Sequence, residues 1–284
     1  MNVVAILCKR GTAGTPDILN GLIRYLDGKI KTLRIAEGVC CGEGQAEVVP
    51  EEKLGDGADL LIVLGGDGTL LHAVKLLRGR DAPILGVNLG RLGFLTEIQL
   101  SELYPTLDKI LAGECPTQIR RMLHATLTRE GKEILSQDVL NDVVINNGAL
   151  ARILRLHVGT AQGFMTSYRG DGLIISTPTG STAYNMAAGG PVLYPTLATF
   201  ALTPICPHTF ANRPVVLPDD EEVIVELTEA TSDVHLSLDG QAGAVMRQGD
   251  IVRVRRATTT ARLVRSPTRG YFDILREKLG WGQD

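Results

Sequence analysis

The stretch Leu60-Leu61-Ile62-Val63-Leu64-Gly65-Gly66-Asp67-Gly68-Thr69-Leu70-Leu71-His72 runs from an apolar segment into three glycines that enclose one acidic residue. Consecutive aliphatic residues over Asp59–Leu64 are typical of a buried parallel strand, and Leu70–Leu77 has helical spacing. A strand that ends in glycines and leads into a helix brings backbone N–H groups and the partly positive helix end together. The stretch therefore indicates a turn that can bind phosphate.

The acidic residue in this turn is unusual, because a carboxylate beside anionic phosphates is repelled. Gly65, Gly66 and Gly68 would let a phosphate chain approach the backbone with no Cβ in the way. Asp67 makes sense there if it holds a Mg²⁺ that bridges the phosphates, or if it accepts a proton from an attacking hydroxyl. The alternative is an ordinary turn or N-cap residue, since Asp-Gly is a common turn pair.

Two common phosphate-binding motifs do not fit this stretch. A Walker loop needs Gly-Lys-Ser/Thr, but Thr69 follows Gly68 directly. A dinucleotide-binding fingerprint needs a third glycine at position 71, which is Leu71. The turn is therefore a phosphate site of another kind, or it binds no phosphate.

Strand and helix patterns alternate on both sides of the turn. Val3–Cys8 and Pro83–Val87 are further apolar runs, and Asp17–Leu26 has a helical pattern. This alternation predicts an α/β domain with a parallel sheet over residues 1–98. Ser101–Leu111 has helical spacing and is expected to link this domain to the next.

From about residue 119 the apolar pattern changes to period two, which predicts a β-rich domain over residues 99–267. Leu123–Arg129 and Glu133–Asp138 flank Glu130-Gly131-Lys132 and form a hairpin signal. Further strands are expected at Asp142–Ile145, Ile153–Val158, Gly172–Ser176, Val223–Leu227, Val234–Leu238 and Ile251–Val254. Two packed sheets would suit this pattern, although the pattern leaves the topology open. The tail Tyr271–Leu279 has helical spacing and needs a surface to cover its apolar face.

The composition of the 284 residues argues against several classes of protein. A formal net charge of −3 gives no basic excess for binding nucleic acid or an anionic membrane. No segment approaches the roughly 18 apolar residues that a membrane span needs. The five cysteines lack both disulfide and zinc-ligand spacing, which favours a reducing compartment. We therefore expect a soluble cytoplasmic protein without a metal-ligand cluster of its own.

Two further polar clusters adjoin predicted strands. Asn141-Asp142 stands at the mouth of one strand, where it could read ribose hydroxyls or the amino group of a base, or simply cap the strand. The run Arg169 to Asn185 takes another strand into hydroxyl and small residues and then Tyr184, whose ring could lie against a purine. A solvated loop is the alternative for that run. Asp239-Gly240 is expected to form a hairpin turn.

Together these motifs resemble those of the NAD kinase family. The matching segments are Gly65-Gly66-Asp67-Gly68-Thr69, Asn88-Leu89-Gly90-Arg91-Leu92-Gly93-Phe94-Leu95, Asn141-Asp142, Asp171 to Tyr184, Thr203 to His208 and Leu238-Asp239-Gly240-Gln241. The glycine turn is not specific, because diacylglycerol kinases, sphingosine kinases and phosphofructokinases carry similar loops. The run Asp-Gly-Leu-Ile-Ile-Ser-Thr-Pro-Thr-Gly-Ser-Thr-Ala-Tyr is what singles out NAD kinases.

The resemblance implies transfer of the ATP γ-phosphoryl group to the 2′-hydroxyl of the adenosine ribose of NAD⁺, giving NADP⁺. It implies that Asp67 is the catalytic base and that the ATP phosphates meet Gly65, Gly66, Gly68 and Thr69. The residues it implies for NAD are Asp67, Gly68, His72, Asn141, Asp142, Arg152, Arg169, Asp171, Thr182, Ala183, Tyr184, Asn185, Met186, Ala187 and Gln241. It also implies Mg²⁺ delivered with ATP, a homodimer or homotetramer, and a tail, residues 268–284, that returns to complete the first domain.

Two other classes of function remain open at this level. A lipid or sugar kinase could share the glycine turn, although neither an acyl-binding cavity nor an arginine-rich sugar-phosphate site can be picked out. A non-catalytic dinucleotide sensor would bind NAD and regulate a partner. Asp67 argues against a sensor, because a sensor has no need of a carboxylate that faces phosphates.

Overall fold

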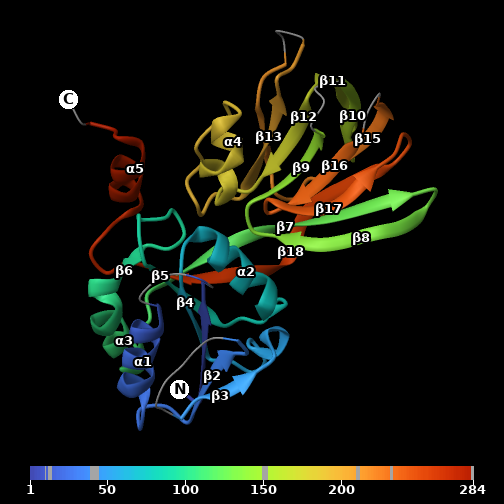
Figure 1. The fold of residues 1–284 in the computed structure, drawn as a ribbon. Helices are drawn as coiled ribbons and strands as arrows, with labels where there is room; N and C mark the ends of the chain where they lie inside the picture. Colours follow the sequence, from blue (N-terminus) through green and yellow to red (C-terminus); the bar gives the residue numbers. More distant parts are fainter. Residues whose placement is uncertain are drawn as a thin grey trace. The chain divides into compact units, whose positions relative to one another are not determined.

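The computed structural model describes residues 1–9, 11, 15–38, 45–148, 153–208, 212–230 and 233–282. The predicted site residue Arg152 lies outside the described residues. The chain forms two compact units, which are Met1–Ile119 with Ala261–Asp284, and Arg120–Thr260 (Figure 1). The chain therefore leaves the first unit once and re-enters it near its end.

A parallel sheet forms the centre of the first unit, as the sequence predicted. Its strands are β1 (Val3–Cys8), β2 (Thr32–Ala36), β3 (Glu47–Val49), β4 (Leu60–Leu64), β5 (Pro83–Asn88) and the short β6 (Ile98–Gln99). Five of them run in the order β5-β4-β1-β2-β3, every neighbouring pair is parallel, and β6 adds to β5. All five residues of β4 are buried, which explains why its sequence is uniformly aliphatic.

The helices of this unit are α1 (Thr15–Leu26), α2 (Asp67–Leu77), α3 (Leu103–Leu111) and α5 (Tyr271–Leu279), with short 3₁₀ turns at Glu51–Lys53 and Leu100–Glu102. The tail helix α5 has the predicted bounds. Helix α2 begins at Asp67, earlier than the apolar spacing from Leu70 suggested, because Gly66 is its N-cap. None of the helices in the described parts of the chain has both the length and the apolarity needed to cross a membrane.

The division of the chain differs from the expected domain ends at residues 98 and 267. The first unit runs to Ile119 because α3 buries Leu103, Leu107 and Ile110 in the same apolar cluster as α1 and β1. It resumes at Ala261 because the last strand of the chain ends beside β5, with Arg262 paired to Pro83. Helix α3 is therefore part of the first unit and does not link the two units.

The second unit consists of antiparallel strands. They are β7 (Thr117–Arg129), β8 (Lys132–Val139), β9 (Asp142–Asn147), β10 (Leu154–Thr160), β11 (Gly163–Gly170), β12 (Gly172–Ser176), β13 (Thr199–Ile205), β14 (Val215–Pro218), β15 (Val223–Glu229), β16 (Val234–Leu238), β17 (Gln241–Met246) and β18 (Ile251–Val264). One sheet has the order β14-β13-β12-β9-β16-β17, and β11-β10-β15-β18 form the other, to which β7 and β8 add. A single apolar cluster takes buried side chains from both sheets, so the unit is a sandwich.

The sequence pattern missed several of these strands for identifiable reasons. Strand β13 contains Pro204, which cannot donate to the ladder, and β17 is rich in Ala and Gly, which are weak strand formers. Strand β18 runs for 14 residues, although only its first four were expected. Its pattern is hidden because arginines and threonines follow the first apolar residues.

Candidate active site

The glycine turn of the first unit joins β4 directly to α2. Gly66 is the N-cap of α2 in an extended conformation, and no side chain caps the helix. The N–H groups of Thr69 and Leu70 both donate to the Gly66 carbonyl, at 3.0 and 3.1 Å. Among the described residues, the N–H groups of Asp67 and Gly68 find no hydrogen-bond partner. The turn therefore presents unused donors at the positive end of a helix, which is the arrangement that binds phosphate.

The three glycine positions of the turn do not exclude a side chain for the same reason. A Cβ at Gly65 would lie 2.5 Å from the Thr69 Oγ1, so packing within the turn excludes one. A Cβ at Gly66 or Gly68 would meet nothing within 4 Å. Glycine costs about 1 kcal/mol relative to alanine inside a helix, so packing alone does not explain Gly68 in α2. The open space beside Gly66 and Gly68 is available to a ligand.

The carboxylate of Asp67 binds the backbone of a second sequence motif. Its Oδ2 accepts the Phe94 N–H at 2.9 Å, and its Oδ1 accepts the Leu95 N–H at 3.1 Å and the Thr96 N–H at 3.0 Å. The Thr96 hydroxyl also donates to Oδ1, at 3.0 Å. Asp67 is therefore the first helical residue and not the N-cap. A carboxylate offers about four acceptor positions, so Oδ2 is the oxygen with capacity left.

The loop that binds Asp67 requires glycine at position 93. A Cβ there would lie 2.0 Å from the Asp67 Oδ1 and 2.4 Å from the Thr96 Oγ1. Asn88, at the end of β5, supports the same loop by donating to the Thr96 hydroxyl at 3.1 Å and accepting the Gly90 N–H at 2.6 Å. The motif at residues 88–95 thus serves to hold Asp67, a role that the sequence could not reveal.

His72 lies one turn further along α2. Its Nε2 is 2.6 Å from the Glu51 Oε1, and both side chains are partly exposed. The imidazole is thus engaged by an acidic neighbour within its own unit. Its contact with NAD stays a prediction.

In the second unit, Asn141 and Asp142 stand where β9 begins, and Asp239 holds this point of the chain. The Asp239 carboxylate accepts the N–H groups of Leu140 at 3.0 Å, Asn141 at 2.6 Å and Asp142 at 3.3 Å. Asp239 and Gly240 have φ values of 52° and 70°, so they form the predicted hairpin turn between β16 and β17. The sequence predicts a turn at Asp239, and nothing in the local pattern indicates this second role.

Asp142 is a buried acid with an unusual titration. Its side chain is almost fully covered, and no described residue hydrogen-bonds to its carboxyl group. Burial, and then the negative charge of Asp239, raise the pKa of Asp142 from 3.8 to about 7. At neutral pH a substantial fraction of Asp142 is therefore protonated and can donate a hydrogen bond.

The loop after β12 packs directly on Asn141. The Asn141 carbonyl accepts the Thr177 N–H at 2.9 Å, and a Cβ at Gly180 would lie 2.2 Å from that carbonyl oxygen. The Oδ1 of Asn141 and the Oγ1 of Thr179 are both buried without a hydrogen-bond partner among the described residues. Buried polar atoms normally have partners, so these two leave hydrogen-bonding capacity unused where β9 begins.

The short turn Gly180–Thr182, the following Ala183 and helix α4 (Tyr184–Ala187) contain six of the fifteen predicted NAD contacts. Thr182 is buried, Ala183 and Met186 are half-buried, and Tyr184 and Ala187 are exposed. Asn185 is fully buried, and its amide binds the Ser181 and Pro191 carbonyls and the Thr203 hydroxyl. Asn185 therefore shapes the loop from inside, whereas the Tyr184 ring is free to cover a base.

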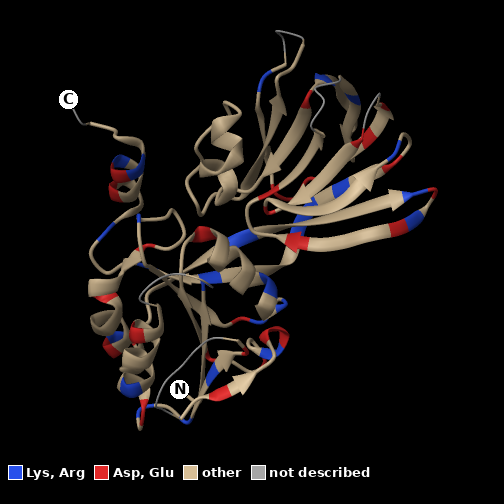
Figure 2. Ribbon diagram, viewed as in Figure 1, with Lys and Arg blue, Asp and Glu red and all other residues tan. Residues whose placement is uncertain are grey.

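No Lys, Arg, Asp or Glu occurs between residues 172 and 208. Figure 2 shows this as uncoloured ribbon over α4, β12 and β13. Strand β12 and most of β13 are buried, so this uncharged stretch is exposed mainly around α4 and the residues that follow it. That it receives a nucleoside stays a prediction.

Of the remaining predicted residues of this unit, Gln241 and Asp171 lie at opposite ends of the six-stranded sheet, and Arg169 lies in the other sheet. Gln241 begins β17 beside the Asp239 turn, so it lies at the same end as Asn141 and Asp142. Asp171 precedes β12, and its N–H donates to the Ile205 carbonyl at the opposite end, while Arg169 lies exposed at the end of β11. Thr177 is six positions after Asp171, and six steps of extended chain span roughly 20 Å.

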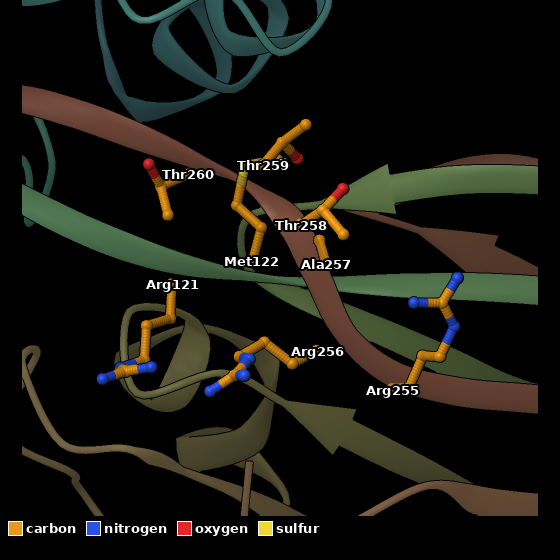
Figure 3. Close-up of a pocket in the computed structure, with 8 residues that line it drawn as sticks. All are labelled: Arg121, Met122, Arg255, Arg256, Ala257, Thr258, Thr259 and Thr260. Atoms are coloured by element: carbon orange, nitrogen blue, oxygen red, sulfur yellow. Dashed lines mark hydrogen bonds between the residues drawn. The ribbon is translucent and has the colours of Figure 1, made fainter. Parts of the chain in front are cut away.

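The second unit also contains a cavity of about 500 Å³ that no predicted site residue lines. Its lining is Arg121, Met122 and the stretch Arg255 to Thr260. Arg121 and Arg256 lie side by side in Figure 3, because both bind the buried carboxylate of Asp219, at 2.7 and 3.3 Å. Two of the three arginines that line the cavity are thus already paired with Asp219.

Open N–H donors beside a fixed acid in the first unit, and unpartnered buried polar atoms in the second, are features that a nucleotide-dependent phosphotransferase would need. The ATP-NAD kinase N-terminal domain matches residues 24–115, and the ATP-NAD kinase C-terminal domain matches residues 140–266. The NAD kinase of Geobacter metallireducens is 52% identical over 283 residues, which is 100% of both chains. That of Syntrophotalea carbinolica is 52% identical over 225 residues, or 79% of each chain. This chain belongs to the ATP-NAD kinase family.

Solved structures agree on the fold. The crystal structure of yeast NADH kinase complexed with NADH superposes with a TM-score of 0.92 at 24% identity, covering 100% of this chain and 89% of that one. An NAD kinase from Archaeoglobus fulgidus in complex with ATP gives a TM-score of 0.74 at 24% identity, covering 98% and 99%. The expected architecture, an α/β unit, a β-rich unit and a C-terminal helix that belongs to the first unit, is confirmed.

Proposed function

We propose that this protein is an NAD kinase that transfers the γ-phosphoryl group of ATP to the 2′-hydroxyl of the adenosine ribose of NAD⁺. The observation that supports this proposal best is the state of the Asp67 carboxylate. Three backbone N–H groups and one hydroxyl fix it, and Oδ2 retains acceptor capacity beside the open N-terminus of α2. A fixed acid next to phosphate donors is what transfer to a hydroxyl requires.

The ATP phosphates would bind the turn of the first unit. The N–H groups of Asp67 and Gly68, the bare backbone at Gly66 and the hydroxyl of Thr69 are the groups proposed to receive them. The described residues contain no group of three or more His, Cys, Asp or Glu side chains that could hold a metal ion. A Mg²⁺ delivered with the nucleotide would suit this turn, where Asp67 is the acidic residue that could face it. Such an ion would neutralise charge on the phosphates.

The chemical step would proceed with Asp67 as the proton acceptor. As the ribose 2′-oxygen forms its bond to the γ-phosphorus, the bond from that phosphorus to the β–γ bridging oxygen breaks and ADP leaves. The hydroxyl proton passes to the Asp67 Oδ2. Because a carboxylate is a weak base towards a free hydroxyl, the proton would move late, once charge has shifted onto the phosphoryl group.

The adenosine portion of NAD⁺ would bind the second unit. The buried and unpartnered Asn141 Oδ1 and Thr179 Oγ1, together with Asp142, are suited to ribose hydroxyls and base nitrogens. The exposed ring of Tyr184 would lie against the adenine, with the segment Thr182 to Ala187 around it and Gln241 at the rim. Arg152, His72 and Gly68 complete the proposed NAD contacts.

Asp171 lies at the other end of the six-stranded sheet, and Arg169 lies in β11 of the other sheet. Both positions affect the proposed assembly. An extended dinucleotide could reach both ends, or Asp171 could serve the site of a neighbouring copy. The second arrangement would require the homodimer or homotetramer that we propose, in the cytoplasm where both substrates are found. Analytical ultracentrifugation with and without NAD⁺ would test the assembly.

The proposed reaction is tested by incubating the purified protein with Mg-ATP and NAD⁺ and detecting NADP⁺ with an NADP-specific dehydrogenase. Diacylglycerol and sugars serve as competing acceptors. Production of NADP⁺ alone is the expected result. Phosphorylation of a lipid or sugar in its place would identify another kinase, and tight NAD binding in calorimetry without any product would identify a sensor.

A further inference from the structure

Asp239 has more contacts than a hairpin turn requires. Asparagine followed by glycine forms the same turn, and there the amide would offer only one acceptor oxygen. The Asp239 carboxylate uses both oxygens, with Oδ2 on the Leu140 N–H and Oδ1 on those of Asn141 and Asp142. The Asp239 N–H returns a hydrogen bond to the Asp142 carbonyl at 3.0 Å. One side chain therefore holds three consecutive residues almost 100 positions away in the sequence.

The residues that it holds are those whose side chains lack partners. The carboxyl group of Asp142 has no hydrogen-bond donor or acceptor among the described residues, and the Asn141 Oδ1 is buried and unpartnered. On the opposite side, the Thr177 hydroxyl donates to the Leu140 carbonyl at 2.6 Å. The backbone of residues 140–142 is thus fixed from two sides while its side chains stay available.

Asp239 also places a negative charge beside a second buried acid. Both Asp142 and Asp239 are less than a tenth exposed. Among the strands that pair with β9, β12 carries no charged side chain, and β16 carries only His235, which pairs with Asn146 near the other end of β9. The carboxylate of Asp239 is therefore the charged group near Asp142 at this end of the neighbouring strands. Because two negative charges repel each other, the carboxylate of Asp239 favours the neutral form of Asp142.

We propose that Asp239 is a positioning residue for the dinucleotide, which fixes residues 140–142 and keeps Asp142 protonated, so that Asp142 donates a hydrogen bond to the adenosine portion of the ligand. This proposal rests on the function proposed above. The raised pKa of Asp142, about 7, agrees with it, because Asp239 is the second cause of that shift after burial. A donor at this position suits a ring nitrogen of the adenine, which an ionised carboxylate would repel, or the oxygen of a ribose hydroxyl.

The test compares Asp239→Asn with Asp250→Asn. Asp250 is a matched control, because it is another buried acid in a turn of the same unit, binding the Arg247 N–H at 2.8 Å and the Arg129 guanidinium. For Asp239→Asn we expect the KM for NAD⁺ to rise about tenfold or more, while the KM for ATP changes less than about twofold. For Asp250→Asn we expect a lower melting temperature but an unchanged KM for NAD⁺.

The pH dependence separates positioning from general destabilisation. In the wild type, kcat/KM for NAD⁺ should fall as the pH rises through about 7. Asp239→Asn should move this fall to lower pH by about one unit, because it removes the charge that keeps Asp142 neutral. In an Asp142→Asn background the fall should be absent, and adding Asp239→Asn should shift nothing further.

An unchanged KM for NAD⁺ and pH profile in Asp239→Asn would overturn the inference. The inference would also be overturned if Asp239→Asn shifted the pH profile by the same amount in the Asp142→Asn background. Calorimetric titration of NAD⁺ into the same variants gives a readout that does not depend on turnover. If the wild type binds NAD⁺ but makes no NADP⁺, the proposed function fails, and the calorimetric pH profile still tests Asp239.

Discussion

At the scale of single residues, two acids differ in what surrounds them. Four donors fix Asp67, whereas Asp142 is buried with no partner for its carboxyl group among the described residues. A fixed carboxylate suits the task of accepting one proton at one place. A buried and unpartnered acid suits the task of recognising a ligand that supplies the missing partner.

Replacing Asp67 with asparagine should remove most turnover. General base catalysis contributes typically 10²- to 10⁴-fold, so we expect kcat to fall by about 10³-fold with a KM for NAD⁺ within about threefold of the wild type. Steady-state kinetics with Mg-ATP and NAD⁺ measures both. Asp81→Asn is the control, because it makes the same change of charge at an exposed ion pair with Arg262 in the same unit. Near-normal turnover of Asp67→Asn would leave Asp67 with a positioning role only.

The raised pKa of Asp142 predicts how stability varies with pH. The folded pKa of about 7 exceeds the ordinary value of 3.8, so between these values the folded state binds more protons than the unfolded one. This residue therefore makes the free energy of unfolding fall as the pH rises from about 4 to 7, by on the order of 4 kcal/mol in total.

The measurement is the melting temperature of the wild type and of Asp142→Asn from pH 5 to 8. The variant should gain stability relative to the wild type as the pH rises, because asparagine does not ionise. Asp250 acts in the opposite sense, since its bonds to Arg129 outweigh burial and lower its pKa, so its contribution is lost as the pH falls. A constant difference between the two proteins across this range would contradict the raised pKa of Asp142.

At the scale of elements, the turn between β4 and α2 contains glycines that are needed for different reasons. Gly65 is needed for packing, and Gly68 is proposed to leave room for a ligand. Gly68→Ala should leave stability unchanged or raise it by up to about 1 kcal/mol, because its Cβ meets open space within a helix. It should nevertheless raise the KM for ATP about tenfold or more, because that space is proposed for phosphate. Gly65→Ala should lower the melting temperature, because its Cβ would lie 2.5 Å from the Thr69 Oγ1.

Melting curves and the KM for ATP of both variants provide the test. If Gly68→Ala binds ATP normally, the phosphate does not approach the backbone there. The comparison is informative because the two positions lie in one turn and receive the same methyl group. Only their surroundings differ.

At the scale of the whole molecule, the chain makes the first unit from two separate segments. The returning segment carries α5, whose Tyr271, Ile274 and Leu275 are buried. Arg269 and Thr268 bind the Glu102 carboxylate, and the Lys278 ammonium lies 5.5 Å from the centre of the Phe94 ring. Phe94 donates its N–H to Asp67, so the tail supports the loop that holds the proposed base.

Ending the chain after Pro267 should therefore impair both folding and catalysis. Losing three buried side chains should destabilise the first unit by several kcal/mol, on the order of 4. Thermal melting and limited proteolysis should show the residues before Ile119 becoming sensitive first. A chain that ends after Gly282 keeps α5 and should melt like the wild type. An equally stable truncated chain would show that α5 contributes nothing to the unit.

Local sequence patterns were enough for much of the fold. The aliphatic run of β4, the helix after it and the tail helix α5 were predicted because burial on both faces, or on one helical stripe, leaves a pattern within a few residues. Strands with proline, alanine or glycine, such as β13 and β17, left no such pattern. The glycine turn was recognisable by itself, since its strand, glycines and acid are consecutive.

The sequence by itself thus determined many of the elements, the glycine turn and the family. Only the tertiary structure determined that the Asp67 carboxylate binds residues 94–96, that Asp239 holds residues 140–142, and that Asp171 lies far from Asn141 along the sheet. These contacts join positions distant in the chain, and hydrogen bonds between distant backbone groups leave no periodic signal. Strand pairing and loop packing bring them together, so they become visible only once the chain has folded.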